Sequence, residues 1–402
     1  GHNHGVFDNH LGGTLDRDWI IPRYLRDAGY TTGLVGKFIS DWHYKYEPPH
    51  FDAYAAFQGD YTDIPFWVKN LGEATYHTET APYTTDWIGA KAAAFVDDFE
   101  ADDDRPWFMQ VAPHAPHDNK LDESATTSSC DVNALYTWAD RHDNVPVPAW
   151  IPTPAVTVEG NPAEKADKVP YLQAKRYSTD CSAANHDGQL RTLLAADDMV
   201  ETVMQKLADR GELDNTLVIF TTDNGYSWGE RGVTSKGLPY TEHVQAPFLV
   251  RWDGVFPAGG TDDRLVGGED FLPTYLQAAQ YSPPEVHYPL DGRSFLPGQP
   301  GRQVKLLEFG PLGRPNPPRY EAHRGIPTWA SLRTAGWQYI EYYGADNTTV
   351  QWQEYYDLTR DPWELDNLLV SDPGRVPDVA SLSAELRHYS SCAGTSGTTA
   401  CP

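Results

Sequence analysis

Four short segments of this sequence carry side chains that could hold a tetrahedral anion and a hard metal ion. One apolar run is followed by Gly36-Lys37, and a second is followed by Ala112-Pro113-His114-Ala115-Pro116-His117. A third leads into Thr221-Thr222-Asp223-Asn224-Gly225, and Ser235-Lys236-Gly237 comes shortly after it. Ammonium and imidazole groups can bind the oxygens of an anion, and carboxylate and amide oxygens bind hard cations. The sequence therefore predicts a site where an anionic group meets a metal ion.

The candidate metal ligands are Asp223 and Asn224. Paired hard oxygens suit Ca²⁺, with Mg²⁺ as the alternative, whereas a zinc site would more often carry His at the second position. An Asx turn after a strand, which Asn224-Gly225 favours, would explain the same pair without any ligand. The presence of the lysine and histidine segments favours the metal site.

The candidate anion-binding residues are Lys37, His114 and Lys236. His114 and His117 alternate with two prolines directly after a predicted strand, and such rigid imidazoles suit an anion-binding or proton-donating role. A proline-rich connector with exposed histidines is the alternative. Both lysines adjoin glycines, which let the backbone approach a ligand, although a lone lysine is usually a solvated surface residue. No residue of the chain resembles the nucleophile that such a site needs.

Composition limits the class of protein and of partner. The chain has 402 residues, enough for one large α/β domain with a smaller appendage. Its net charge of -26 argues against nucleic acid or an anionic membrane as a partner. No apolar run approaches the ~18 residues that suggest a membrane-spanning helix. An anionic substrate must therefore be held by a local cluster of positive groups.

Four cysteines without C-x-x-C spacing favour two disulfides in an exported protein over a zinc site. We expect Cys392 to pair with Cys401 across a loop of small residues, and Cys130 to pair with Cys181 across an irregular insertion. The protein is accordingly expected to be secreted or otherwise extracytoplasmic. The chain begins with Gly1 and shows no signal sequence, so its start is expected to be processed or truncated.

Helix and strand signals alternate through the first two-thirds of the chain, and the candidate residues follow strands. Helical periodicity with start and stop signals predicts helices over 21–28, 85–99 and 190–210. Thr84 or Thr85 is expected to cap the second of them. Apolar runs predict strands over 31–35, 107–111 and 217–220, the last of them of the buried parallel type. Because ligands gather beyond the carboxyl ends of strands in open α/β sheets, we expect Lys37, His114 and Asp223 to share one pocket.

Two stretches depart from this alternation. Residues 118–187 are rich in Pro, Ser and Asp without clear periodicity, which predicts an irregular insertion near the mouth of the site. After a proline-rich linker over 311–318, alternating segments and a final helix capped by Asp378 predict a small antiparallel sheet with a helix. We therefore divide the chain into a catalytic domain, 1–300, and a C-terminal subdomain, 301–402.

The order of these motifs resembles the sulfatase family of the alkaline-phosphatase-like superfamily, over nearly the whole chain. His2-Asn3-His4-Gly5-Val6 is similar to the segment downstream of the family's nucleophile, and the four segments above match later motifs in the right order. Residues 354–367 resemble the signature of the family's C-terminal subdomain. The opening and the Gly-Lys-aromatic-aliphatic segment most resemble the N-acetylglucosamine-6-sulfatase branch. The resemblance implies a three-layer sandwich with a large, mostly parallel central sheet and a smaller C-terminal antiparallel subdomain.

The resemblance also implies a chemistry. In this family a cysteine or serine in C-x-P-x-R is oxidised to formylglycine, whose hydrate attacks sulfur. The resemblance assigns Asp223 and Asn224 to Ca²⁺, and Lys37, His114 and Lys236 to the sulfate oxygens of a sulfated carbohydrate or an aryl sulfate. Attack on a sulfate monoester moves negative charge toward the leaving oxygen, so fixed cations and a proton donor supply the main stabilisation.

The chain departs from the family pattern in three respects. No cysteine is followed by x-Pro-x-Arg, and the early aspartate pair of the metal site is missing, so both are expected upstream of Gly1. Ile39 stands where many members have His, followed by Ser40 and Asp41, which leaves the acid for the leaving alcohol open. We expect the 402-residue chain to be inactive alone, with a separate N-terminal fragment as a candidate partner.

Three functions remain open on the sequence. The leading one is an exported, calcium-dependent sulfatase. The second is a phosphodiesterase or phosphonate hydrolase of the same fold, although Asn224 in place of His weighs against its zinc chemistry. The third is a non-catalytic protein that binds sulfated glycans. A C-x-P-x-R or S-x-P-x-R motif before Gly1 would support the first function, and its absence would support the third.

Overall fold

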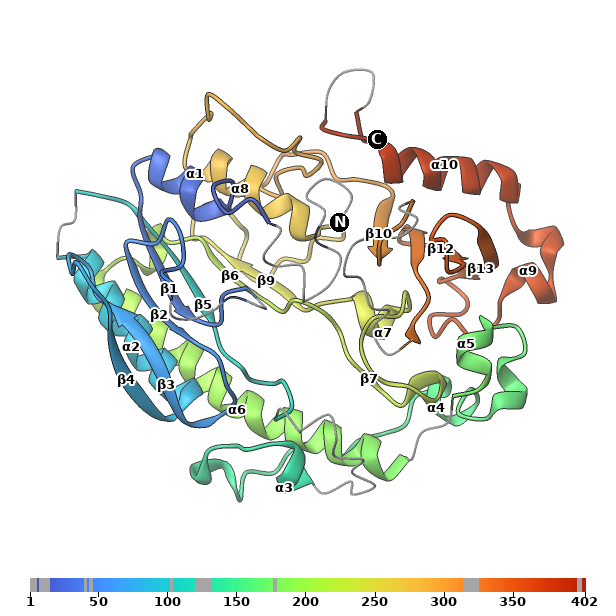
Figure 1. Ribbon diagram of the computed structural model, residues 1–402, viewed down its shortest axis with the longest axis horizontal. Helices are drawn as coiled ribbons and strands as arrows, with labels where there is room; N and C mark the ends of the chain where they lie inside the picture. The colour runs from blue at the N-terminus through green and yellow to red at the C-terminus, as the bar shows by residue number, and fades with distance from the viewer. Residues whose placement is uncertain are drawn as a thin grey trace.

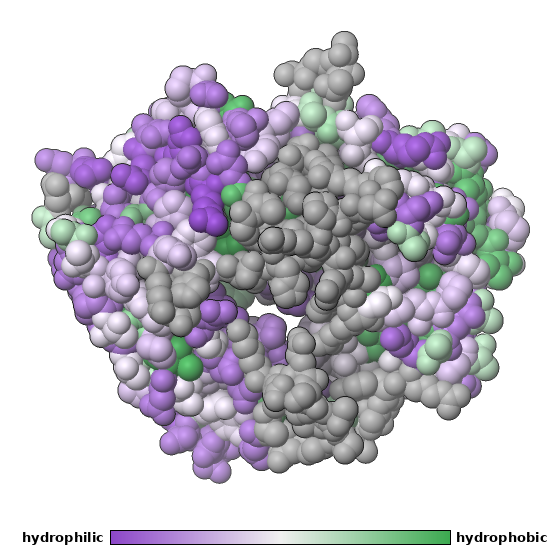
Figure 2. Space-filling model, viewed as in Figure 1, coloured by the Kyte–Doolittle hydropathy of each residue, from purple (hydrophilic) through white to green (hydrophobic). Residues whose placement is uncertain are grey.

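The structure, a computed structural model, describes residues 6, 15–39, 42, 46–101, 104–119, 132–175, 179–313, 325–395 and 400–402. Its elements form two groups (Figure 1), with a five-stranded sheet and its helices on one side and a four-stranded C-terminal sheet on the other. Figure 2 shows that much of the face in this view is hydrophilic, with smaller hydrophobic patches between. None of the described helices is long and apolar enough to cross a membrane.

The five-stranded sheet is mixed, and the prediction of a mostly parallel sheet is wrong for it. Its order is β4-β3-β2-β1-β5, in which β1 is parallel to β2 and β5 while β3 is antiparallel to β2 and β4. The strands are β1 (Thr31–Gly36), β2 (Ala53–Phe57), β3 (Thr62–Lys69), β4 (His77–Tyr83) and β5 (Trp107–Ala112). Only short loops join β2 to β3 and β3 to β4, and a parallel pair would need a crossover of about a dozen residues or more.

The predicted strand over 217–220 forms, but it is neither parallel nor buried. β6 (Val218–Thr221) pairs antiparallel with β9 (Phe248–Arg251) in a separate two-stranded sheet. Phe220 is 38% exposed and Leu249 is 64% exposed. An apolar run identifies a strand, whereas its partner is set by contacts distant in sequence. A second small hairpin joins β7 (Ser227–Trp228) to β8 (Thr234–Ser235).

Helices cover both faces of the five-stranded sheet, which confirms the layered α/β arrangement. α2 (Thr84–Phe99) and α6 (Thr179–Arg210) pack together and against the face that carries Val35. α1 (Ile21–Asp27) and α8 (Phe271–Ala278) lie on the face that carries Leu34, where Tyr275 of α8 contacts Phe108. Neighbouring residues of one strand point to opposite faces, so β1 can be buried on both sides.

Two predicted details of these helices are wrong. α6 begins at Thr179, within the stretch predicted to be irregular, because polar residues of its first turns hide the apolar period. α2 begins at Thr84 after Tyr83 and has no side-chain cap, since the Thr84 hydroxyl donates to the Asp60 carbonyl instead. The rest of the described insertion is irregular with short helices, as predicted. They are α3 (Val132–Leu135), α4 (Pro154–Thr157) and α5 (Pro170–Gln173).

The C-terminal antiparallel sheet is confirmed and has four strands in the order β10-β11-β12-β13. They are β10 (Lys305–Phe309), β11 (Trp329–Arg333), β12 (Trp337–Tyr343) and β13 (Val350–Asp357). α9 (Leu368–Ser371) and α10 (Val379–Ser391) follow, and the Asp378 side chain caps α10 at the Ser381 amide, as predicted. Most of the predicted linker lies outside the described residues, and the division at residue 300 stays a prediction.

One of the two predicted disulfides is described. Cys392 and Cys401 are bonded, with their sulfur atoms 2.04 Å apart. Cys130 lies outside the described residues, so its pairing with Cys181 stays a prediction.

Candidate active site

Lys37 is placed by the close contact of two parallel strand ends. Its backbone amide donates to the Ala112 carbonyl at 2.8 Å, at the end of β5. The preceding Gly36 has φ 117°, and a Cβ there would lie 2.1 Å from the same carbonyl oxygen. A side chain at this position would therefore push β1 away from β5.

Replacing Gly36 by Ala should lower the free energy of unfolding by about 1–3 kcal/mol or more. The new Cβ would clash with the Ala112 carbonyl oxygen, and the positive φ is unfavourable for alanine. Gly72→Ala is the matched control, since Gly72 also has a positive φ, 81°, but no atom within 4 Å of its added Cβ. Urea unfolding of both variants measures the difference. Equal losses would show that the contact at Ala112 does not constrain this turn.

His114 holds Lys37 in place. The Lys37 ammonium donates to His114 Nδ1 at 2.9 Å, which leaves the ring proton on Nε2 to donate to the Asp118 carbonyl at 3.0 Å. The imidazole side chain is fully buried, and burial together with the Lys37 charge lowers its pKa to about 3. His114 is therefore neutral at ordinary pH with both nitrogens engaged. This geometry supports a positioning role and opposes the proton-donating role.

A second pair forms where β6 ends. The Lys236 ammonium donates to Asn224 Oδ1 at 2.9 Å, and the β7–β8 hairpin brings the two segments together. The turn is fixed by Gly225, whose amide donates to the His243 carbonyl at 2.9 Å. Asp223 is exposed, and its Oδ1 accepts a hydrogen bond from the Thr222 hydroxyl at 3.3 Å.

Asp223 and Asn224 fit part of a calcium shell. Their carboxylate and amide oxygens are the donor types that Ca²⁺ and Mg²⁺ take. Ca²⁺ prefers about six to eight oxygens, and the described residues contain no group of three or more His, Cys, Asp or Glu side chains that could hold a metal ion. The remaining ligands must come from water, substrate or residues outside the described set.

The two pairs lie beside one face of α6. The Tyr226 hydroxyl, just beyond the Asp-Asn pair, donates to Asn185 of this helix at 3.4 Å. Three turns farther along, Ala196 packs with Ala115 of the histidine loop, residues 113–117. Residues eleven apart point in nearly the same direction from a helix. The structure thus shows the pairs Lys37–His114 and Asn224–Lys236, and their convergence on one pocket stays a prediction.

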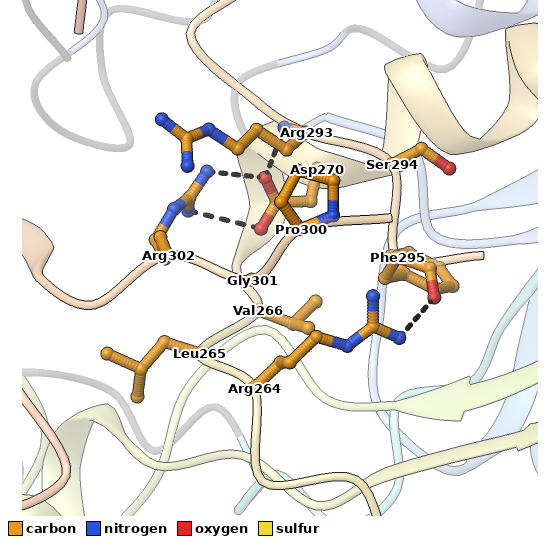
Figure 3. Close-up of a pocket in the computed structure, with 10 residues that line it drawn as sticks. All are labelled: Arg264, Leu265, Val266, Asp270, Arg293, Ser294, Phe295, Pro300, Gly301 and Arg302. Carbon is orange, nitrogen blue, oxygen red and sulfur yellow. Dashed lines mark hydrogen bonds and ion pairs between the residues drawn. The ribbon is translucent and has the colours of Figure 1, made fainter. Parts of the chain in front are cut away.

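Two other features of the described residues do not compete with this site. Ser371-Asp372-Pro373-Gly374-Arg375 has the S-x-P-x-R spacing, but Ser371 is the last residue of α9, on the opposite side of the molecule from β1 (Figure 1). Figure 3 shows a pocket of another kind, in which Arg302 and Asp270 are bonded at 2.6 Å and Arg264 donates to the Phe295 carbonyl. Its arginines are largely taken up by such contacts, and no candidate residue lines it. His2, Ser40 and Asp41 lie outside the described residues.

Comparisons with known proteins point to one family. Residues 1–281 match the family model Sulfatase, and residues 229–391 match the model N-sulphoglucosamine sulphohydrolase, C-terminal. The chain is 26% identical to an N-acetylglucosamine-6-O-sulfatase of Bacteroides thetaiotaomicron, over 91% of this chain and 71% of that protein. It is 27% identical to the human N-acetylglucosamine-6-sulfatase, over 98% of this chain and 74% of that protein.

Solved structures share the fold. BT4656 in complex with its substrate D-glucosamine-2-N,6-O-disulfate superimposes with a TM-score of 0.75 and 21% identity, covering 96% of this chain and 84% of that one. A phosphonate monoester hydrolase from Silicibacter pomeroyi superimposes with a TM-score of 0.62 and 21% identity, covering 96% and 82%. The fold is therefore alkaline-phosphatase-like, and it is common to both chemistries. The family model matches more than half of the residues, so this chain belongs to the sulfatase family.

Proposed function

We propose that this protein hydrolyses sulfate monoesters of a sulfated sugar, with Lys37 and Lys236 binding the sulfate oxygens. The observation that carries the proposal is the way the lysines are held. Lys236 is fixed by the neutral amide of Asn224 and makes no ion pair with the described residues, while Lys37 donates to a neutral imidazole. The neutral amide orients the Lys236 ammonium without cancelling its charge, as an anion site in a protein of net charge -26 requires.

The groups of the site have separate tasks in this proposal. The two ammonium groups bind the sulfate and stabilise the charge that develops as the ester bond breaks, and His114 keeps Lys37 in position. Asp223 and Asn224 would hold part of the shell of a Ca²⁺ ion, which polarises a sulfate oxygen when bound. A formylglycine, expected upstream of Gly1, would supply the attacking oxygen.

The substrate class and the compartment are parts of the same proposal. The relatives named as N-acetylglucosamine-6-sulfatases support a 6-sulfated amino sugar as the substrate. The Cys392–Cys401 disulfide supports an exported protein, because disulfides persist mainly in oxidising compartments.

The test uses these 402 residues joined to their natural upstream sequence and produced together with a formylglycine-generating enzyme. We expect sulfate release from N-acetylglucosamine 6-sulfate and from 4-nitrophenyl sulfate, lost with a chelator and restored by Ca²⁺. Asp223→Ala should lower the affinity for Ca²⁺ by at least about tenfold, which corresponds to about 1.4 kcal/mol of binding free energy. Calcium titration followed by calorimetry measures this change.

Asp253→Ala is the matched control for the metal test. Asp253 is also an exposed carboxylate, but it pairs with Arg251 at 2.8 Å, so its loss should leave Ca²⁺ affinity unchanged. Faster turnover of a phenylphosphonate ester than of either sulfate ester would instead support the phosphonate hydrolase reading. An absence of turnover with formylglycine in place would overturn the proposed function.

A further inference from the structure

Asp60 carries a carboxylate that the proposed chemistry has not used. It lies in the loop between β2 and β3, and its Oδ1 is 3.7 Å from His114 Nε2, which is too far for a hydrogen bond. That nitrogen is already engaged with the Asp118 carbonyl at 3.0 Å. The Oδ1 atom of Asp60 is enclosed and has no hydrogen-bond partner among the described residues, although the side chain as a whole is 32% exposed. The carboxylate is therefore an acceptor that lacks a donor within the described structure.

The backbone around Asp60 holds this acceptor in one position. The Asp60 carbonyl accepts from the Thr84 hydroxyl at 3.1 Å, and the Tyr61 carbonyl accepts from the Thr84 amide at 2.7 Å. The Tyr61 hydroxyl in turn donates to the His117 carbonyl at 2.5 Å. These bonds tie the loop to the start of α2 and to the histidine loop. Enclosing a carboxylate oxygen without a hydrogen bond is unfavourable, so a fixed oxygen of this kind is suited to a ligand that brings its own donor.

Asp60 and Lys37 approach the same imidazole from its two nitrogens. The Lys37 ammonium donates to His114 Nδ1 at 2.9 Å, while the Asp60 carboxylate lies beside Nε2. The carboxylate is thus separated from the ammonium by little more than the width of one ring. In a sugar sulfate the hydroxyl groups and the ester belong to the same sugar residue, so one residue can reach both groups.

A carboxylate in this position selects for hydrogen-bond donors. It repels a second anionic group, and it accepts hydrogen bonds from hydroxyl groups. A site that bonds a substrate hydroxyl discriminates strongly against an analogue without it, because the polar group of the site is then left unpaired. An aryl sulfate such as 4-nitrophenyl sulfate has no hydroxyl to offer. The lysines alone cannot make this distinction, because both kinds of ester carry the same sulfate.

We propose that Asp60 is a specificity-determining residue, which accepts a hydrogen bond from the C3 or C4 hydroxyl of the sugar that carries the sulfate. The inference rests on the proposed function and names the part of the substrate that is recognised besides the sulfate. The bond supplies the donor that Oδ1 lacks, and it favours sugar sulfates over aryl sulfates. Asp60 takes part in no covalent step.

The first experiment compares two substrates in the formylglycine-containing protein. In Asp60→Ala, kcat/KM on N-acetylglucosamine 6-sulfate should fall about 10²-fold, the loss expected when a hydrogen bond to a charged acceptor is removed. On 4-nitrophenyl sulfate kcat/KM should change by no more than about threefold, because this ester makes no such bond. Asp60→Asn keeps an acceptor oxygen without the charge, so on the sugar sulfate it should lose only about tenfold.

Deoxy substrates test the hydrogen-bond partner directly. The 3-deoxy and 4-deoxy analogues of N-acetylglucosamine 6-sulfate each lack one ring hydroxyl, and one of them should lose about 10²-fold in kcat/KM with the unchanged protein. On that analogue Asp60→Ala should cost no more than about threefold further, because a coupled pair loses its interaction only once. Losses that multiply on both analogues would overturn the proposal.

Asp104→Ala is the matched control. Asp104 is also an aspartate with no hydrogen-bond partner among the described residues, but it precedes β5, at the opposite end of that strand from the histidine loop. Both kcat/KM values should therefore stay within about twofold of those of the unchanged protein. Calorimetry with inorganic sulfate tests the anion site without turnover. Asp60→Ala should bind sulfate within about threefold of the unchanged protein, because the lysines remain.

The outcomes separate the two proposals. Equal losses of kcat/KM on the sugar sulfate and the aryl sulfate, or no loss on the sugar sulfate, would overturn the role of Asp60 while leaving the sulfatase function intact. No turnover of either ester by the unchanged protein would refute the proposed function itself. Loss of sulfate binding in Asp60→Ala would show that Asp60 supports the Lys37–His114 pair instead of contacting the sugar, which would also overturn the inference.

Discussion

Replacing Lys236 by Ala should lower kcat/KM on a sulfate ester by about 10²–10³-fold, the loss typical of removing one fixed donor to a developing charge. Lys236 is held by Asn224 at 2.9 Å, so its ammonium needs little reorganisation when the anion binds. Lys37→Ala should have an effect of similar size, because His114 fixes that lysine in the same way. Steady-state kinetics and calorimetric titration with sulfate measure both losses.

Lys206→Ala is the matched control for the lysine variants. Lys206 pairs with Asp97 at 2.8 Å on the surface of α6, so its loss should change kcat/KM by no more than about twofold. A Lys236→Ala protein with unchanged kcat/KM would show that this lysine is only a structural partner of Asn224. Loss of turnover together with loss of folded structure would be detected by circular dichroism.

The second large effect is on stability. Arg231→Leu should lower the free energy of unfolding by about 3–5 kcal/mol, because it leaves Glu242 without its counter-charge and Glu159 with Lys168 alone. The Arg231 side chain is fully buried and lies 3.2 Å from Glu159 and 2.5 Å from Glu242. It also donates to the Trp363 carbonyl at 2.5 Å, so one guanidinium joins the insertion, the segment after β7 and the C-terminal subdomain.

The stability lost in Arg231→Leu should depend on pH, and the direction of that dependence can be predicted. Burial raises the pKa of Glu242 to about 7, and it raises the pKa of Glu159 as well. Without Arg231 both carboxyls should bind protons at still higher pH. A carboxyl whose pKa is higher in the folded than in the unfolded protein stabilises the fold at pH values below its unfolded-state pKa. This stabilisation is lost as the pH rises through its folded-state pKa. The deficit of Arg231→Leu should therefore be smaller at pH 5 than at pH 8, as measured by urea unfolding.

Arg360→Leu is the control for the stability test. Arg360 is 72% exposed and lies 3.7 Å from Asp357, and such surface pairs contribute about 0–1 kcal/mol. If both arginine variants lost the same stability, the buried cluster would not be what joins the three segments. A deficit that did not change between pH 5 and pH 8 would contradict this, because it would show that the two carboxyls do not change their protonation in that range.

Local pattern was enough to identify many elements and the residues after them. Gly36-Lys37 follows a strand as predicted, and the final helix is capped by Asp378 as predicted. Cys392 and Cys401 are close in sequence, so their loop could be recognised without a structure. These features depend on residues within a few positions of each other, which sequence periodicity, capping and loop closure describe directly.

The tertiary structure decided which strands pair, which side chains are charged and which task each side chain can perform. The apolar run over 217–220 indicated a strand but not its antiparallel partner β9. The sequence named both histidines of the loop, but only burial beside Lys37 makes His114 neutral and leaves His117 with an exposed nitrogen. Burial and long-range contacts set strand partners and protonation states, and they depend on residues far apart in the chain. For that reason the sequence by itself determined the kind of site, and the fold determined which side chain can do which task.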